Sequence, residues 1–401
     1  MALAPSLMRS APIIESDESE QQDELTSSWR RGAGEAGGVV STRSVHRNHP
    51  GPAVHPSLRR RGVVLLLGVL GALLGGRVFA AAPRPLRPEV AAFIDEMAQR
   101  HQYDRTLLRR LLGRIKPRTS ILRAMSAPGT ARPWHVFRER YIDDVRIAEG
   151  ARFWRLHAEV IGRASREFGV PEEIIVATIG VETLYGRDTG NFKVVEALAT
   201  LAFDYPPRAD FFRGELEQFL LLAREIRLDM TRVTGSYAGA IGIPQFLPSS
   251  YRKYAVDYDG DGKPDLMGAP ADAIGSVANY YRSFGWEAGG VVAVPAEAAA
   301  SAVDAVLAAG IKPHSTVVAL RQRGVVPLAA VRDDAEAALF SLETESGVEY
   351  WLGLQNFYVI TRYNRSVNYA MVVYELAREL RSVIQREGSK PVPEREMTPA
   401  P

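Results

Sequence analysis

The feature that most constrains the fold of this chain is an apolar helical segment, residues 174–184, that carries one carboxylate. A proline and two acidic residues precede the segment, which is the pattern of a helix start, and Gly186 follows its end. Glu182 stands four residues after Thr178 and three after Ile179, so its side chain lies on the apolar face. The segment therefore predicts a buried helix with a carboxylate among its buried side chains.

Glu182 has two physical explanations. Burying an ionised carboxylate is costly, so the side chain either meets a cation or raises its pKa and keeps its proton near neutrality. A protonated carboxyl can act as a general acid, and such groups accelerate bond cleavage by roughly 10²- to 10⁴-fold. The alternative is a structural glutamate paired with an arginine such as Arg187 or Arg208.

A second segment, GSYAGAIGIPQFLPSSY at residues 235–251, combines glycines and prolines with polar side chains. Glycine allows backbone conformations closed to other residues, and proline fixes turns. Ser236, Tyr237 and Gln245 would be held on this stiff loop, where they suit hydrogen bonding to a polyhydroxyl ligand. A tight connection would also be rich in glycine and proline, but it does not require Gln245.

The rest of the chain predicts a mainly helical α+β protein. The composition, 46% hydrophobic and 24% charged, is that of a globular protein, and the net charge of +2 gives no reason to expect nucleic acid. Residues 287–358 contain short β-branched runs, 290–294 and 315–320, between turn residues, so we expect a small strand-containing insert. Apolar spacing predicts further helices at residues 88–110, 153–168, 211–226, 273–284 and 369–384.

The first 82 residues are expected to precede the folded domains. Residues 1–58 lack periodicity and form either a disordered extension or a stretch upstream of the true start codon. Residues 59–82 begin with three consecutive arginines, continue with a run of 12 apolar or glycine residues and end in small residues, which is the layout of an export signal. A retained membrane anchor is the alternative, but the run is short of the roughly 20 residues that span a bilayer.

The chain contains no cysteine, so it has neither disulfides nor a site for lipid attachment. We therefore expect a soluble periplasmic protein that is not a lipoprotein.

The stretch DYDGDGKPD has the layout of a calcium loop. Asp257, Asp259 and Asp261 stand at positions 1, 3 and 5, with a glycine at position 6. At position 12 Gly268 replaces the usual bidentate glutamate. A surface turn followed by a helix cap is the alternative. Because three acids this close repel one another unless a cation lies among them, we expect a structural Ca²⁺. No cluster of His, Cys and Glu suggests a catalytic metal.

Several motifs in order, GVETLYG, ALATLAFDYPPRADFF, GSYAGAIGIPQFLPSSY, DYDGDG and AIGSVANYY, resemble the membrane-bound lytic murein transglycosylase B family of the lysozyme-like superfamily. The match runs from about residue 153 to residue 369. The resemblance implies cleavage of the β-1,4 bond between N-acetylmuramic acid and N-acetylglucosamine in peptidoglycan, leaving a 1,6-anhydromuramoyl end. The expected layout is an N-terminal helical domain at residues 83–150, a lysozyme-like catalytic core at 151–286 and 359–385, the insert at 287–358 and a disordered tail at 386–401.

The resemblance also implies roles for individual residues. Glu182 falls on the family's catalytic acid/base, which first protonates the leaving oxygen and then deprotonates the C6 hydroxyl. Water is not consumed, so the reaction is a lyase reaction, and it needs no cofactor. For the metal loop, the resemblance suggests that Asp272 and the carbonyl of Lys263 complete the ligand set. The implied substrate-binding residues are Ser236, Tyr237, Gln245, Arg208, Tyr363, Asn364 and Tyr369.

Three residues depart from the family pattern: Pro207 replaces one member of a basic pair, and Phe137 and Phe211 stand where a relative has tyrosines. These departures leave the preference for the peptide stem open.

Two other functions stay open at this point. A hydrolytic lysozyme would need a positioned water and usually a second carboxylate, which no motif supplies. A non-catalytic peptidoglycan-binding protein would use Glu182 only in an ion pair. In each case the expected partners are glycan strands and cell-wall synthesis or division proteins, and the expected state is a monomer.

Overall fold

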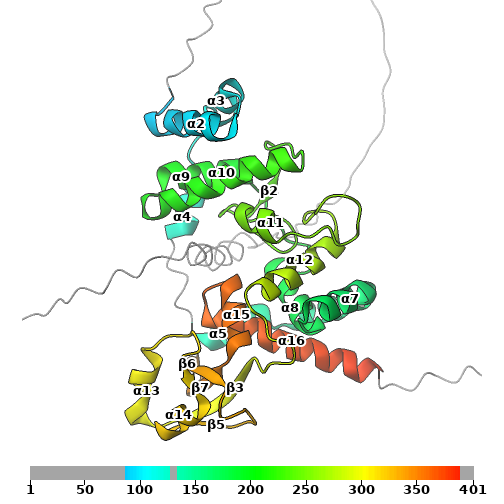
Figure 1. The fold of residues 1–401 in the computed structure, drawn as a ribbon, viewed down its shortest axis with the longest axis vertical. Helices are drawn as coiled ribbons and strands as arrows, with labels where there is room; N and C mark the ends of the chain where they lie inside the picture. The colour runs from blue at the N-terminus through cyan, green and yellow to red at the C-terminus, as the bar shows by residue number, and fades with distance from the viewer. Residues whose placement is uncertain (1–85, 127–132, 389–401) are drawn as a thin grey trace, which may run out of the picture.

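The computed structural model describes residues 86–126 and 133–388 of the 401-residue chain (Figure 1). The predicted N-terminal extension, the export segment and most of the predicted tail lie outside these residues. Within them, no helix combines the length and the hydrophobicity needed to cross a membrane.

The N-terminal part is helical, as expected, but the predicted helix at 88–110 is two helices, α2 (Pro88–His101) and α3 (Arg105–Leu112). Gln102 breaks the helix in the left-handed conformation, with φ 55°, and Asp104 caps α3 by accepting from the Thr106 N–H at 2.7 Å. The Tyr103 hydroxyl donates to the Leu220 carbonyl, so this pair of helices is fastened to the core.

The core is an assembly of helices that includes α8 (Glu172–Thr183), and every residue of α8 from Ile174 onward is buried. Helix α8 contacts α6 (Asp144–Leu156), α7 (Ala158–Phe168), α12 (Pro270–Ser283) and α16 (Val367–Gly388), and Figure 1 shows it among the last three. The predicted helix at 153–168 is divided at His157 between α6 and α7. The other core helices are α4 (Thr119–Ser126), α5 (Trp134–Tyr141), α6 (Asp144–Leu156), α7 (Ala158–Phe168), α9 (Val194–Asp204), η1 (Pro206–Arg208), α10 (Ala209–Glu225), α11 (Pro248–Tyr254), α12 (Pro270–Ser283), α15 (Gln355–Tyr363) and α16 (Val367–Gly388).

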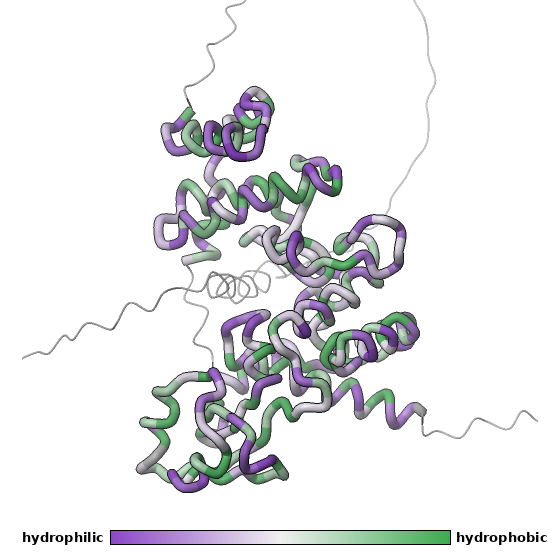
Figure 2. The backbone as a smooth tube through the Cα atoms, viewed as in Figure 1, coloured by the Kyte–Doolittle hydropathy of each residue, from purple (hydrophilic) through white to green (hydrophobic). Residues whose placement is uncertain are grey.

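Hydrophilic and hydrophobic segments alternate along these helices in Figure 2, as expected where one face is buried. A single hydrophobic cluster joins side chains of α2, the core helices and part of the insert. The division into domains therefore stays a prediction.

The insert is a five-stranded antiparallel sheet in the order β4-β6-β7-β3-β5, with a small hydrophobic cluster of its own. Its elements are β3 (Ala293–Ala298), α13 (Ala300–Leu307), β4 (Ser315–Thr316), α14 (Val317–Gln322), β5 (Val325–Pro327), β6 (Glu336–Thr344) and β7 (Gly347–Gly353). A separate two-stranded ladder, β1 (Phe192–Lys193) with β2 (Thr234–Gly235), lies in the core.

The predicted strand at 315–320 is wrong beyond its first two residues, because the chain turns into α14 at Val317. The Thr316 side chain accepts from the Ala319 N–H and starts the helix. Val317 and Leu320 are three residues apart and both fully buried, so one helical face packs into the insert's cluster. Packing here overrides the β preference of the valines and threonine.

After β7 the chain returns to the core through α15 and α16, and α16 lies against α8 (Figure 1). Elements before and after the insert therefore meet beside the end of α8. This meeting point contains Glu182 and Tyr369, two of the predicted site residues.

Candidate active site

Glu182 occupies the last turn of α8 and is only 2% exposed. The hydroxyl of Tyr369, on α16, donates to Glu182 Oε1 at 2.9 Å. Tyr369 is itself fully buried. The structure thus joins two predicted site residues and fixes the orientation of the carboxyl group.

The helix stops abruptly after this residue. Leu184, Tyr185 and Gly186 all have left-handed backbones, with φ of 49°, 60° and 86°. The turn sends the Tyr185 ring back between two helices at positions that lack a side chain. A Cβ on Gly180 would lie 2.4 Å from the Tyr185 hydroxyl, and one on Gly150 would lie 2.2 Å from it. The two glycines therefore provide the space that the ring fills.

Ser236 is fully buried and organises the glycine-rich loop from within. Its Oγ accepts from the backbone N–H groups of Ala238 at 3.2 Å and Ala240 at 2.9 Å. Tyr237 beside it is 1% exposed, with its ring packed edge-on against Phe192. Ser236 thus holds the loop in shape, a role that its residue type alone did not reveal.

Gln245 is held in the loop with φ 54°, an unfavourable conformation for a residue with a Cβ. Its Nε2 donates to the carbonyls of Gly242 at 2.8 Å and Thr189 at 3.1 Å. Within the described residues its Oε1 is buried and has no hydrogen-bond partner, and the same is true of Asn364 Oδ1. A buried acceptor without a donor costs about 1–3 kcal/mol. The two amide oxygens are therefore candidate acceptors for ligand N–H or O–H groups.

Tyr363 joins the loop to the helices that follow the insert. Its hydroxyl donates to the Pro244 carbonyl at 2.6 Å, and its ring lies nearly parallel to that of Tyr369, with centroids 6.4 Å apart. Thr183, which sequence reasoning did not select, holds the same loop from α8 by donating to the Ile243 carbonyl at 2.8 Å. Its signal was a small polar side chain directly after Glu182 at the end of an apolar helix.

Arg187 and Arg208, the two arginines considered as partners of Glu182, each contact another side chain. Arg187 forms an ion pair with Glu149 at 2.6 Å, and the Arg208 guanidinium lies 4.5 Å from the centre of the Phe211 ring. Phe137, another departure from the family pattern, packs against Tyr141. A cation–π contact therefore links Arg208 to Phe211, one of the residues that depart from the family pattern.

The acidic loop brings three of its predicted ligands together. Carboxylate oxygens of Asp257, Asp259 and Asp272 lie within 4.8 Å of one another, and Asp272 is fully buried. Asp261 is not part of this group, and its Oδ1 accepts from the Lys263 N–H. Three converging carboxylates suit a hard cation such as Ca²⁺.

Asp272 does not cap α12, which was the alternative to metal binding. The N-cap of α12 is Ala269, and no side chain caps it. Asp272 accepts instead from loop N–H groups, those of Tyr258, Asp259 and Asp265.

The acidic loop is attached to the glycine-rich loop. The N–H of Ile243 donates to the Leu266 carbonyl at 2.8 Å. The Tyr251 hydroxyl donates to the Pro264 carbonyl and accepts from the Leu266 N–H, each at 2.9 Å. The two loops are therefore held in one arrangement by hydrogen bonds.

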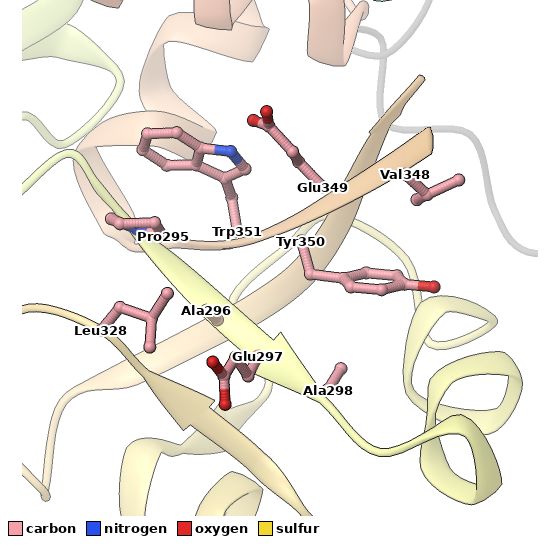
Figure 3. A pocket seen from close by; sticks show the side chains of 9 residues that line it. All are labelled: Pro295, Ala296, Glu297, Ala298, Leu328, Val348, Glu349, Tyr350 and Trp351. Carbon is pink, nitrogen blue, oxygen red and sulfur yellow. The ribbon is translucent and has the colours of Figure 1, made fainter. Parts of the chain in front are cut away.

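A surface pocket of about 540 Å³ lies elsewhere, on the sheet of the insert (Figure 3). Glu349 and Trp351 project from the same side of β7, and Pro295 and Leu328 complete that wall. None of the predicted site residues lines this pocket.

Three comparisons place the chain among known proteins. A family model described as the transglycosylase SLT domain matches residues 85–378. Membrane-bound lytic murein transglycosylase B of Escherichia coli K12 is 43% identical over 301 residues, which are 73% of this chain and 82% of that protein.

Two solved structures share the fold. The soluble lytic transglycosylase SltB1 from Pseudomonas aeruginosa has 48% identity and a TM-score of 0.70, over 74% of this chain and 100% of that one. The Escherichia coli lytic transglycosylase Slt35 in complex with calcium has 41% identity and a TM-score of 0.68, over 74% and 93%. The predicted lysozyme-like, mainly helical fold is thereby confirmed, and this chain belongs to the transglycosylase SLT domain family.

Proposed function

We propose that this protein cleaves peptidoglycan through Glu182 as its single acid/base and releases 1,6-anhydromuramoyl ends. The coarser function follows from the family and the relatives: the chain is a lytic transglycosylase of peptidoglycan. The observation that carries the finer proposal is the buried Glu182 carboxyl, oriented by the Tyr369 hydroxyl beside a loop with an unsatisfied amide oxygen.

One carboxyl can serve both halves of the reaction. The protonated Glu182 gives its proton to the glycosidic oxygen as the bond to C1 of the muramoyl residue breaks. The resulting carboxylate then takes the proton of the C6 hydroxyl, whose oxygen bonds to C1. The leaving sugar keeps the first proton, the C6 hydroxyl supplies the one that reprotonates Glu182, no water is consumed, and the carboxyl is ready for another cycle.

The other buried carboxylates support a single-carboxyl mechanism, because each is engaged elsewhere. Among the described residues these are Glu215 and Asp272. Glu215 accepts from the Ser249 hydroxyl at 2.5 Å and from its N–H at 3.1 Å. Asp272 belongs to the acidic loop. An ordinary glycosidase would place a second carboxylate across the scissile bond from the first.

We also propose how the substrate is held. The amide oxygens of Gln245 and Asn364 accept from the acetamido N–H or hydroxyl groups of the sugars. From the family resemblance we assign Tyr237, Tyr363 and Tyr369 to the sugar-binding cleft, and Arg208 to a carboxylate of the muramoyl or peptide part. Ser236 acts indirectly, by keeping the loop in shape.

Product analysis tests this function. Purified peptidoglycan sacculi digested by the protein should release muropeptides with anhydro ends, identified by their mass. Reducing ends in their place would show a hydrolytic lysozyme and contradict the proposal. The products of a heat-inactivated sample provide the background.

We further propose that the acidic loop binds a structural Ca²⁺ through Asp257, Asp259 and Asp272, with Asp261 and the Lys263 carbonyl completing the set. The three converging carboxylates support this, as does the calcium complex of Slt35. The ion would offset the repulsion between the acids and hold the loop against α12; nothing in the reaction proceeds through it.

Removing calcium with a chelator should lower the melting temperature by roughly 5 °C, and added Ca²⁺ should restore it. Differential scanning calorimetry measures the shift. Asp259→Asn should abolish the response to calcium, whereas Asp304→Asn, an exposed acid on α13, should keep it. A melting curve indifferent to both chelator and calcium would refute the site.

We propose a periplasmic location, because the substrate lies outside the cytoplasmic membrane. The supporting export segment at residues 59–82 lies outside the described residues. Cell-wall synthesis or division proteins as partners, and the monomeric state, stay predictions.

A further inference from the structure

Thr183 makes two short hydrogen bonds in opposite roles, and its side chain is 1% exposed. Its hydroxyl donates to the Ile243 carbonyl at 2.8 Å and accepts from the Gly186 N–H at 3.0 Å. The first bond holds the glycine-rich loop, and the second holds the left-handed turn that ends α8. One hydroxyl next to Glu182 therefore fixes two segments relative to the helix end.

The same stretch of loop is held from the opposite side. The carbonyl of Pro244, directly after Ile243, accepts from the Tyr363 hydroxyl at 2.6 Å. Tyr363 packs against Tyr369, which donates to Glu182. Contacts therefore run from the Glu182 carboxyl through the two tyrosines to the loop. The loop is in turn bonded to Thr183, the residue directly after Glu182. We call this closed set of contacts the Glu182 ring.

The loop held by the Glu182 ring also presents Gln245, one residue after Pro244. A shift of the loop would change the distance between the amide oxygen that binds sugar and the carboxyl that breaks the bond. Misplacing a reacting group by about 1 Å can cost roughly 10²-fold in rate.

We infer that Thr183 is a positioning residue of the transglycosylase reaction: its hydroxyl sets the place of the sugar-binding loop relative to the Glu182 carboxyl. The inference rests on the proposed function, in which Glu182 is the acid/base. The plain alternative is that Thr183 only ends the helix and contributes to stability.

The first experiment compares Thr183→Val with Thr183→Ser on soluble glycan strands. Valine keeps the shape but removes both hydrogen bonds, whereas serine keeps them. We expect Thr183→Val to lower kcat by about 10- to 100-fold with KM within about 3-fold of the wild type, and Thr183→Ser to keep kcat within about 3-fold. Equal kcat values for the valine and serine variants, or an effect on KM alone, would overturn the inference.

A double-variant cycle separates positioning from stability. Tyr363→Phe removes the hydrogen bond to Pro244 and opens the Glu182 ring on its other side. If the loop is held by both contacts together, Thr183→Val with Tyr363→Phe should lose little more kcat than the worse single variant. Losses that multiply would mean two independent roles and would overturn the inference. Assays well below each variant's melting temperature exclude unfolding as the cause.

The outcome does not depend on the products. Anhydro ends released by the wild type decide the proposed function, whereas the relative rates of the variants decide the role of Thr183. Reducing ends with the same pattern of rates would overturn the former and leave Thr183 as the positioning residue of a hydrolase.

Discussion

Replacing Glu182 with glutamine should abolish cleavage and leave folding and substrate binding intact. Glutamine has nearly the same shape, and its amide oxygen can still accept from Tyr369, but it can neither give nor take the proton that the reaction moves. We expect kcat to fall by roughly 10²- to 10⁴-fold. The measurement is the release of soluble muropeptides, with binding followed by co-sedimentation with intact sacculi.

A matched control is Glu159→Gln, the same substitution at an exposed position of α7, which should leave the rate unchanged. Normal release of anhydromuropeptides by the Glu182 variant would remove the basis of the mechanism. A variant that no longer cuts but keeps its full biological effect would instead favour the non-catalytic peptidoglycan-binding protein.

The second large effect concerns stability. Gly180→Ala should destabilise the protein by about 1–3 kcal/mol, although alanine is the better helix former. The new methyl group would lie 2.4 Å from the hydroxyl and 2.5 Å from the Cζ of Tyr185. The ring cannot retreat, because the backbone of Gly150 lies on its other side, and a Cβ there would be 2.2 Å away. Calorimetry should show a melting temperature lower by several degrees.

Gly214→Ala provides the matched control, since it makes the same change inside α10, where an added Cβ would meet nothing within 4 Å. It should stabilise the protein by about 0.5–1 kcal/mol. The two substitutions are thus expected to have opposite signs. A Gly180→Ala variant as stable as the wild type would show that Tyr185 can leave its place between the helices.

Local signals allowed much of the helical structure to be predicted. The start of α8 at Glu172 and the end of α12 before Gly285 follow from a proline, two acids and a glycine that act over a few residues. The run at 315–320 misled for the same reason: its valines favour a strand locally, but the burial of Val317 and Leu320 in the insert's hydrophobic cluster stabilises a helix.

Long-range contacts of the site lie beyond such reasoning. Tyr369 is 187 residues from Glu182, and Tyr363 is 119 residues from Pro244, so no periodicity relates them. Only the resemblance to a family brought the tyrosines into the expected site. The role of Ser236 required the structure, because its oxygen is used by the backbone of its own loop.

The insert separates the two halves of the site along the chain, and this has a consequence for biosynthesis. Glu182 and its loop precede the sheet, whereas Tyr363 and Tyr369 follow it. A nascent chain that ends between Glu182 and α16 would hold the acid but not the side chain that orients it. We therefore expect the enzyme to reach its full activity on the cell wall only after its last helix docks.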